Sequence, residues 1–169
     1  MPAFKYISEG YQVKQKSVFD LDDLYLTLHN WFLFYGYNRN EVEYKVMETE
    51  SYLRVEMRWE NERKAGDDPY VKLHINMGLV ITGLDKTEVV KDGVKIKMDK
   101  GTVEFRLTAF MEKDPEGKWS SSPFMRKIRE LYDKYIIRDR LESYKKLLAT
   151  DERALINEIR SFLHLYKYE

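Results

Sequence analysis

The chain lacks cysteine, a long apolar run and an excess of either charge. Without thiols it has no disulfide, no thiolate nucleophile and none of the cysteine ligands of common structural zinc sites. No window approaches the roughly 18 uninterrupted apolar residues of a membrane-spanning helix. The N-terminal residues also lack the apolar core of a signal peptide. We therefore expect a cytoplasmic protein without a transmembrane segment.

The charge balance limits the class of partner. The sequence has 29 basic and 29 acidic residues and a formal net charge of zero, which argues against a chain dominated by nucleic-acid binding but leaves room for a local patch. Hydrophobic residues make up 43% of the 169 residues, enough for a sizeable core. We expect one domain over residues 1–169, with a body over 11–148 and a terminal helix and aromatic tail over 150–169.

An aromatic helix is predicted near the N-terminus. Asp20 suits its N-cap, and Gly36 suits a left-handed residue after its end. Apolar side chains recur between them at helical spacing, and Trp31, Phe32 and Tyr35 are interpreted as core residues.

A train of antiparallel strands should follow, after a first strand over 11–18. The clearest alternation runs through Leu53, Val55, Met57 and Trp59. Gly78 suggests a bulge. Two tight turns are predicted, one at Asp92-Gly93 and one at Asp99-Lys100-Gly101.

The last third is predicted to be helical. Ser122 and Pro123 mark the start of a long helix that reaches about Ala149, with a kink near Ile137-Arg138. Thr150 is expected to start a second, shorter helix. The fold class is therefore α+β: a curved antiparallel sheet of about six to seven strands, packed against one N-terminal helix, a long C-terminal helix and a shorter terminal helix.

This order of elements resembles the helix-grip superfamily of START-like and birch-allergen-like proteins, over roughly residues 11 to 148. The resemblance lies in the order of elements and not in a motif. It implies a sheet curled around the long helix, with a cavity for an apolar ligand between them. The chain differs from that pattern in having one longer helix after the first strand and an extra terminal helix.

No catalytic signature is present. His29, His74 and His164 do not lie at metal-ligand spacing, and the serines at 120–122 suit a helix cap. We assign no catalytic residue, no metal ligand and no cofactor. An enzyme on a helix-grip-like scaffold would need a polar cluster inside the cavity, such as one around His74.

Two groups of residues are candidates for binding. Methionine is over-represented at adaptable binding surfaces, and several methionines share the apolar phase of their strands; filling an ordinary core is the alternative. The candidate ligand-lining residues are Met57, Trp59, Met77, Met98, Phe105, Met111, Ile128 and Tyr135. The long helix is rich in basic residues and the tail is aromatic, so both could contact a partner; a solvated outer face is the alternative. The candidate partner-binding residues are Arg126, Arg129, Arg138, Arg140, Phe162 and Tyr166.

The leading hypothesis is a non-enzymatic binding module for an apolar small molecule or a protein partner. One alternative is an interaction or assembly protein that acts through the basic helix and the C-terminal tail, with oligomerisation through that tail. Another is RNA binding by the basic face of the sheet, which would require exposed aromatic residues among the basic ones.

Overall fold

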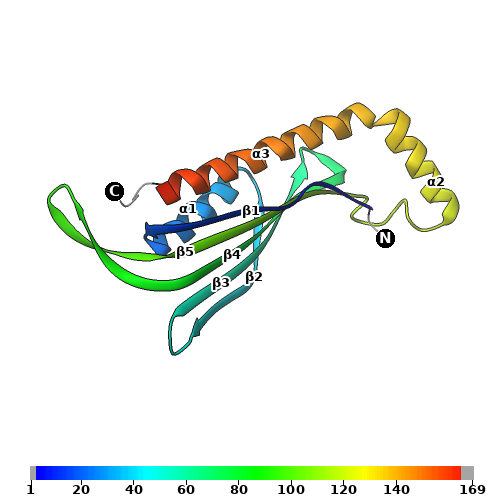
Figure 1. Ribbon diagram of the computed structural model, residues 1–169. Helices are drawn as coiled ribbons and strands as arrows, with labels where there is room; N and C mark the ends of the chain where they lie inside the picture. Colours follow the sequence, from blue (N-terminus) through cyan, green and yellow to red (C-terminus); the bar gives the residue numbers. More distant parts are fainter. Residues whose placement is uncertain (1–2, 165–169) are drawn as a thin grey trace.

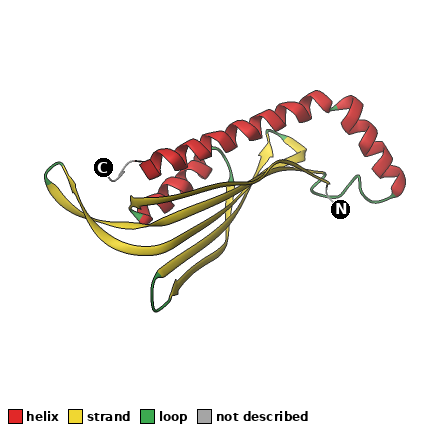
Figure 2. Ribbon diagram, viewed as in Figure 1, coloured by secondary structure: helices red, strands yellow, loops and turns green. Residues whose placement is uncertain are grey.

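The computed structural model describes residues 3–164 as one antiparallel sheet with α1 and α3 on the same side of it (Figure 1, Figure 2). The elements in chain order are β1 (Ala3–Phe19), α1 (Leu21–Phe34), β2 (Asn38–Glu48), β3 (Leu53–Ala65), β4 (Asp68–Lys91), β5 (Val94–Lys113), α2 (Pro123–Leu131), the π-helical turn η1 (Tyr132–Ile136) and α3 (Arg138–His164). The strands lie in the order β1-β5-β4-β3-β2. The α+β class is confirmed, with five strands in place of the six to seven expected.

Two strands are longer than the sequence predicts, so there are fewer of them. β4 and β5 form one long hairpin, and the turn predicted at Asp92-Gly93 is confirmed, with φ angles of 51° and 77°. The turn predicted at Asp99-Lys100-Gly101 is wrong, because these residues lie inside β5 and pair with β1. The glycine serves close packing instead: a Cβ at Gly101 would lie 3.2 Å from Cγ2 of Ile81.

The bulge lies near a different glycine from the one predicted. Gly78 stays in register with Arg58 on β3 and Arg106 on β5, so the predicted bulge there is wrong. The β4–β5 register shifts between Thr82 and Asp85, where Gly83 has a φ angle of 70° that favours glycine. Beyond this point the hairpin curves away from the rest of the sheet (Figure 1).

One face of the central strands forms the core. Burial alternates along β3, β4 and β5, as expected for a sheet with one face covered and one face solvated. The buried face carries Met57, Trp59, Met77, Phe105 and Met111, each at most 3% exposed. The helices α1 and α3 cover this face, so the methionines pack within the main core cluster.

The N-terminal helix has the signals that the sequence predicts. The Asp20 side chain accepts a hydrogen bond from the backbone N–H of Asp23, and Gly36 takes a φ angle of 76° after the helix end. Trp31 and Phe32 are buried, and Tyr35 stacks on Trp31 with ring centroids 4.2 Å apart.

The C-terminal helical region is interrupted at η1, between α2 and α3, and is continuous at Thr150, where a second helix was predicted to start. The Ser122 cap is confirmed by its hydrogen bond from the Met125 N–H, and the π-helical turn at Tyr132–Ile136 accounts for the expected kink. The predicted restart at Thr150 is wrong, because α3 runs through this residue to His164. The Thr150 hydroxyl donates to the carbonyl of Lys146 one turn earlier instead of capping a new helix.

A buried polar cluster ties α3 to the rest of the fold. Asp151 is 3% exposed and accepts hydrogen bonds from the Tyr37 hydroxyl at 2.8 Å and from Nη2 of Arg63 at 2.5 Å. Arg63 also donates to the carbonyl of Tyr35. Asp151 therefore connects α3 to β3 and to the segment after α1.

Candidate functional site

The residues predicted to line a ligand cavity divide into two groups. Met57, Trp59, Met77, Phe105 and Met111 come together on the inner face of the sheet, and Met98 is also buried. Ile128 and Tyr135 lie outside that core, on α2 and η1, and Tyr135 is 69% exposed. An apolar ligand between sheet and helix stays a prediction.

The second group lies on a helical segment that extends beyond the sheet. We call α2 and η1 together, residues 123–136, the arm (Figure 1). No residue of the arm is buried. Phe124, Ile128, Leu131 and Tyr135 recur at spacings of four, three and four residues, which place them on one side of a helix. We call these four residues the arm stripe.

The arm stripe faces solvent. Phe124, Leu131 and Tyr135 are 71%, 58% and 69% exposed, and the neighbouring Ile136 is 72% exposed. Ile128 is half-buried. The sequence-based prediction places two of these residues, Ile128 and Tyr135, beside a cavity between sheet and helix, whereas Tyr135 faces solvent in the structure.

Aromatic packing holds the flank of the arm next to the stripe. The Tyr132 ring stacks on Trp119 with centroids 5.2 Å apart and meets the edge of Tyr70 at 5.7 Å. The Tyr70 hydroxyl donates to Asp133 at 2.6 Å, and Lys113 forms an ion pair with the same carboxylate. Burial and the hydrogen bond to Asp133 raise the pKa of Tyr70, so its hydroxyl remains a donor.

A second anchor lies at the start of the arm. Asp114 is 3% exposed and has a φ angle of 55°. Its carboxylate accepts hydrogen bonds from the backbone N–H of Trp119 and from the Ser120 hydroxyl. Arg129 donates to Ser120 at 2.9 Å and lies 3.9 Å from Asp114. Arg129, one of the predicted partner-binding residues, therefore holds the arm against the loop before it.

The other predicted partner-binding residues are dispersed. Arg126 is exposed on the arm, and Arg138 is exposed at the start of α3. Arg140 lies 3.4 Å from Asp68 on β4, with its side chain 56% exposed. Phe162 is 7% exposed and packs into the core, and Tyr166 lies outside the described residues.

Basic side chains border the arm stripe. Lys127 is exposed beside the stripe and, within residues 3–164, has no ion-pair partner, whereas the exposed Arg126 lies two residues from Phe124 and Ile128, on the other side of the helix. The Lys134 ammonium lies 5.2 Å from the centroid of the Tyr135 ring. Glu130 adds one exposed acidic group. The arm therefore presents an apolar surface with a mainly basic edge, although the chain as a whole is neutral.

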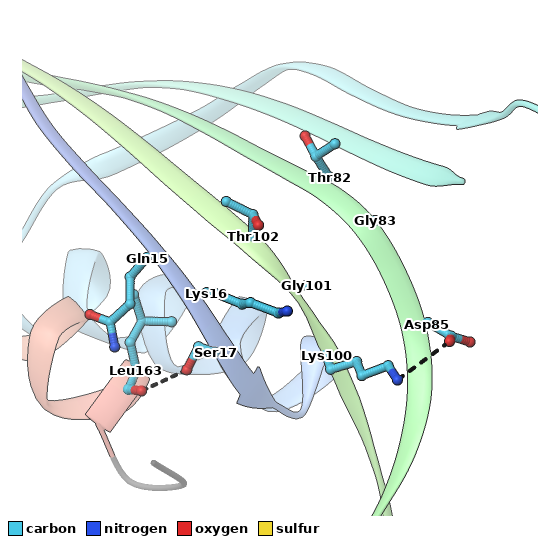
Figure 3. A pocket seen from close by; sticks show the side chains of 10 residues that line it. All are labelled: Gln15, Lys16, Ser17, Thr82, Gly83, Asp85, Lys100, Gly101, Thr102 and Leu163. Atoms are coloured by element: carbon cyan, nitrogen blue, oxygen red, sulfur yellow. Dashed lines mark hydrogen bonds and ion pairs between the residues drawn. The ribbon is translucent and has the colours of Figure 1, made fainter. Parts of the chain in front are cut away.

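A polar pocket lies at the other end of α3, near the β4 register shift (Figure 3). It has a volume of about 940 Å³, and its lining includes the hydroxyls of Ser17, Thr82 and Thr102. Two ammonium groups also line it, from Lys16 and Lys100. The ten lining residues are Gln15, Lys16, Ser17, Thr82, Gly83, Asp85, Lys100, Gly101, Thr102 and Leu163. The Thr82 and Thr102 hydroxyls and the Lys16 ammonium of this lining are groups that can donate hydrogen bonds to an anion.

The pocket has no catalytic arrangement of side chains. Its lining contains one carboxylate, Asp85, which lies 3.7 Å from the ammonium of Lys100. The Ser17 hydroxyl donates to the carbonyl of Leu163 at 2.6 Å, so no base activates it. Within residues 3–164, no group of three or more His, Asp or Glu side chains is placed to hold a metal ion.

The outer face of the sheet contains an aromatic group that the sequence analysis missed. His74 stacks on Phe110 at 4.6 Å and shares a hydrogen bond with Glu112 at 2.8 Å, and Phe4 meets the edge of Phe110. The strict alternation with buried Ala109 and Met111 could have placed Phe110 on this face. Several basic groups there are paired, as Lys72 is with Glu62. RNA binding by this face stays a prediction.

No protein-family model, curated protein or solved structure matches the chain. The resemblance to helix-grip proteins therefore stays a prediction. Within the described residues, no helix is long and apolar enough to cross a membrane.

Proposed function

We propose that the protein is a non-enzymatic binding module that engages a protein partner through the arm stripe. The observation that carries the proposal is the exposure of Phe124, Leu131 and Tyr135 on a segment without a buried residue. Apolar anchors at this helical spacing are a recurring means of binding protein grooves. The contacts of Tyr132 and Asp133 support the same reading, because they hold the arm while Phe124, Leu131 and Tyr135 stay exposed.

The charges around the stripe indicate the chemistry of the partner. Lys127 and Lys134 border it, so an apolar partner surface with an acidic edge would be complementary. Charges at the rim of an interface mainly accelerate association and make it sensitive to salt. We therefore expect binding to weaken as the salt concentration rises, and to require the apolar residues at every salt concentration.

The test is affinity capture from a lysate of the source organism, followed by identification of the bound protein by mass spectrometry and titration with that purified protein. Phe124→Ser/Leu131→Ser should reduce its affinity at least 100-fold, because anchor residues carry most of the binding energy. Val90→Ser/Val94→Ser is the control, since both valines are exposed on the distant β4–β5 hairpin, at 65% and 64%. A partner that both variants bind equally well would overturn the proposal.

Two charge-reversal variants test whether the basic side chains beside the stripe, and not the net charge of the chain, accelerate association. Lys127→Glu/Lys134→Glu should slow association, whereas Lys95→Glu/Lys97→Glu makes the same change of net charge on the exposed hairpin and should leave the rate within about two-fold. Vesicles of phosphatidylglycerol and phosphatidylcholine give the competing outcome, because basic amphipathic helices also bind anionic membranes. If vesicle binding requires the stripe and no protein partner is captured, the stripe binds a lipid surface and not a protein.

The polar pocket favours a second candidate function, the binding of a small anionic molecule. Lys16 has no ion-pair partner within the described residues, and its side chain lies across Gly101 (Figure 3). Titration with inorganic phosphate and with citrate, followed by the amide NMR signals of Gly83 and Gly101, tests this function. Lys16→Met should abolish the shifts and Lys14→Met, on the same strand, should not. Unchanged glycine signals at millimolar ligand would exclude both anions.

A further inference from the structure

The strand β2 forms one edge of the sheet, and most of its residues are exposed to solvent. It pairs with β3 along one side, and no other strand of the described sheet pairs with its second side. Its apolar residues are exposed: Val42 by 40%, Tyr44 by 48%, Val46 by 55% and Met47 by 37%. An exposed apolar edge strand is a template for pairing with another chain.

The sequence of β2 is complementary to itself. In an antiparallel pairing of two copies centred on Tyr44, Glu43 lies opposite Lys45 of the second copy, and Lys45 opposite its Glu43. Tyr44 lies opposite Tyr44, and Val46 opposite Val42, the residue that the β2–β3 ladder skips. A two-fold axis requires this reciprocity, because a residue that contacts another must be contacted by it in turn.

Neighbouring registers lose this match. Centring the pairing on Lys45 sets two lysines against each other, and centring it on Glu43 does the same with two glutamates. Like charges directly opposite each other on adjacent strands destabilise the pair, whereas opposite charges contribute about 0.2–1 kcal/mol each. Among these three registers, the one centred on Tyr44 alone avoids a like-charge pair at its centre.

A hollow beside Tyr44 adds an anchoring site at the centre of the pairing. It has a volume of about 350 Å³, and its lining includes Leu21, Tyr25, Met57 and Tyr44 itself. Partial burial, with the carboxylates of Asp22 and Glu41 nearby, raises the pKa of the Tyr44 hydroxyl. The tyrosine of a second copy would meet this hollow next to the two-fold axis. Tyrosine is among the residues most often found as interface anchors.

We propose that two copies of the chain associate by antiparallel pairing of their β2 strands about Tyr44, which makes one sheet continuous across both copies. The association is independent of the arm stripe, so either proposal can fail without the other. The pairing covers one short strand, and interfaces this small are weak. We expect a dimer that forms in the micromolar range and above.

The absence of cysteine allows a direct test of the register. Tyr44→Cys places two thiols opposite each other, and opposed Cα atoms in antiparallel strands lie about 4.5–5.5 Å apart, within disulfide range. Val46→Cys is the matched control: its two copies would be offset by four positions, about 13 Å at about 3.3 Å per residue. Under mild oxidation, Tyr44→Cys should form a disulfide-linked dimer and Val46→Cys should not. Equal cross-linking of both variants, or of neither, would overturn the register.

Charge exchange tests the same pairing without a cross-link. In sedimentation velocity over a concentration series, Lys45→Glu should raise the dimer dissociation constant about ten-fold, because Glu then faces Glu at two places. Glu43→Lys/Lys45→Glu restores opposite charges and should return the constant to within about three-fold of the unaltered chain. A chain that stays monomeric at every concentration up to 1 mM, about a thousand-fold above the micromolar onset expected of so small an interface, would refute the dimer.

Discussion

Two glycines in the sheet differ in how much space surrounds them. A Cβ at Gly101 would lie 3.2 Å from Cγ2 of Ile81 and 3.3 Å from the carbonyl oxygen of Thr82, whereas a Cβ at Gly78 would first meet Cβ of Arg106 at 3.9 Å. Gly101→Ala should therefore lower the free energy of unfolding by about 1–3 kcal/mol, the usual cost of overpacking. Gly78→Ala should stay within about 0.5 kcal/mol. Urea denaturation measures both, and equal losses would contradict this account of Gly101.

Asp151 should make stability depend on pH in the acid range. Its burial raises the pKa of its carboxyl above the ordinary value of 3.8, and this effect outweighs the opposing hydrogen bond from Tyr37 and charge of Arg63. In the window between the ordinary pKa and the raised one, the folded state binds more protons than the unfolded state. The contribution of Asp151 to stability therefore falls as the pH rises through that window.

Asp151→Asn isolates this contribution, because the amide oxygen can still accept from Tyr37 and Arg63 while the titration is lost. The difference in the free energy of unfolding between the unaltered chain and the variant should decrease as the pH rises above about 4, and then level off. Asp139→Asn, at an exposed position, is the control and should leave the pH profile unchanged. A difference that increases with pH would show that the ion pair with Arg63 outweighs burial.

At the element scale, one side chain connects the arm to two strands. Asp133 accepts from Tyr70 on β4 and pairs with Lys113 on β5. Asp133→Ala removes both contacts, and hydrogen bonds to charged groups contribute about 1.5–3 kcal/mol each. Amide hydrogens of the arm should exchange at least ten-fold faster, with little change in the core strands. Asp139→Ala is the control, and equal exchange in the two variants would show that aromatic packing alone holds the arm.

Element types could be predicted from the sequence, but several ends could not. The caps at Asp20 and Ser122 and the turn at Asp92-Gly93 depend on local backbone chemistry, and all are confirmed. The ends that failed depend on distant contacts. Gly101 reads as a turn residue until its closeness to Ile81 is known, and Thr150 reads as a cap until Asp151 is seen to bind Tyr37 and Arg63.

At the scale of the whole molecule, the residues that make up the arm stripe could be predicted from the sequence, but not whether the stripe faces the core or solvent. The spacing of Phe124, Ile128, Leu131 and Tyr135 defines the arm stripe from sequence alone. It does not say which side of the helix the protein covers. Here the side with Tyr132 packs inward, because Trp119 and Tyr70 offer it aromatic partners and Asp133 finds Lys113. Only the three-dimensional arrangement of these distant residues leaves the stripe outward.

The continuity of α3 gives a final prediction about how the chain can be divided. The sequence suggests that a chain ending at Ala149 would keep the body of the fold. In the structure, the rest of α3 supplies four buried apolar side chains to the core: Leu155, Ile159, Phe162 and Leu163. Burial of such side chains contributes about 1.5–3 kcal/mol each, so the loss is about 6–12 kcal/mol against a typical total stability of about 5–15 kcal/mol. Without Asp151, Arg63 also loses its buried partner.

A chain ending at Ala149 should therefore fail to fold, with poor dispersion in its amide NMR spectrum and no cooperative thermal transition. A chain ending at His164 keeps all of these buried residues and separates the contribution of α3 from that of the tail. Cooperative melting of the shorter chain would mean that the sheet and α1 form a core without α3. In that case the last part of α3 would itself be an accessory segment, and its contacts with Tyr37 and Arg63 would be dispensable.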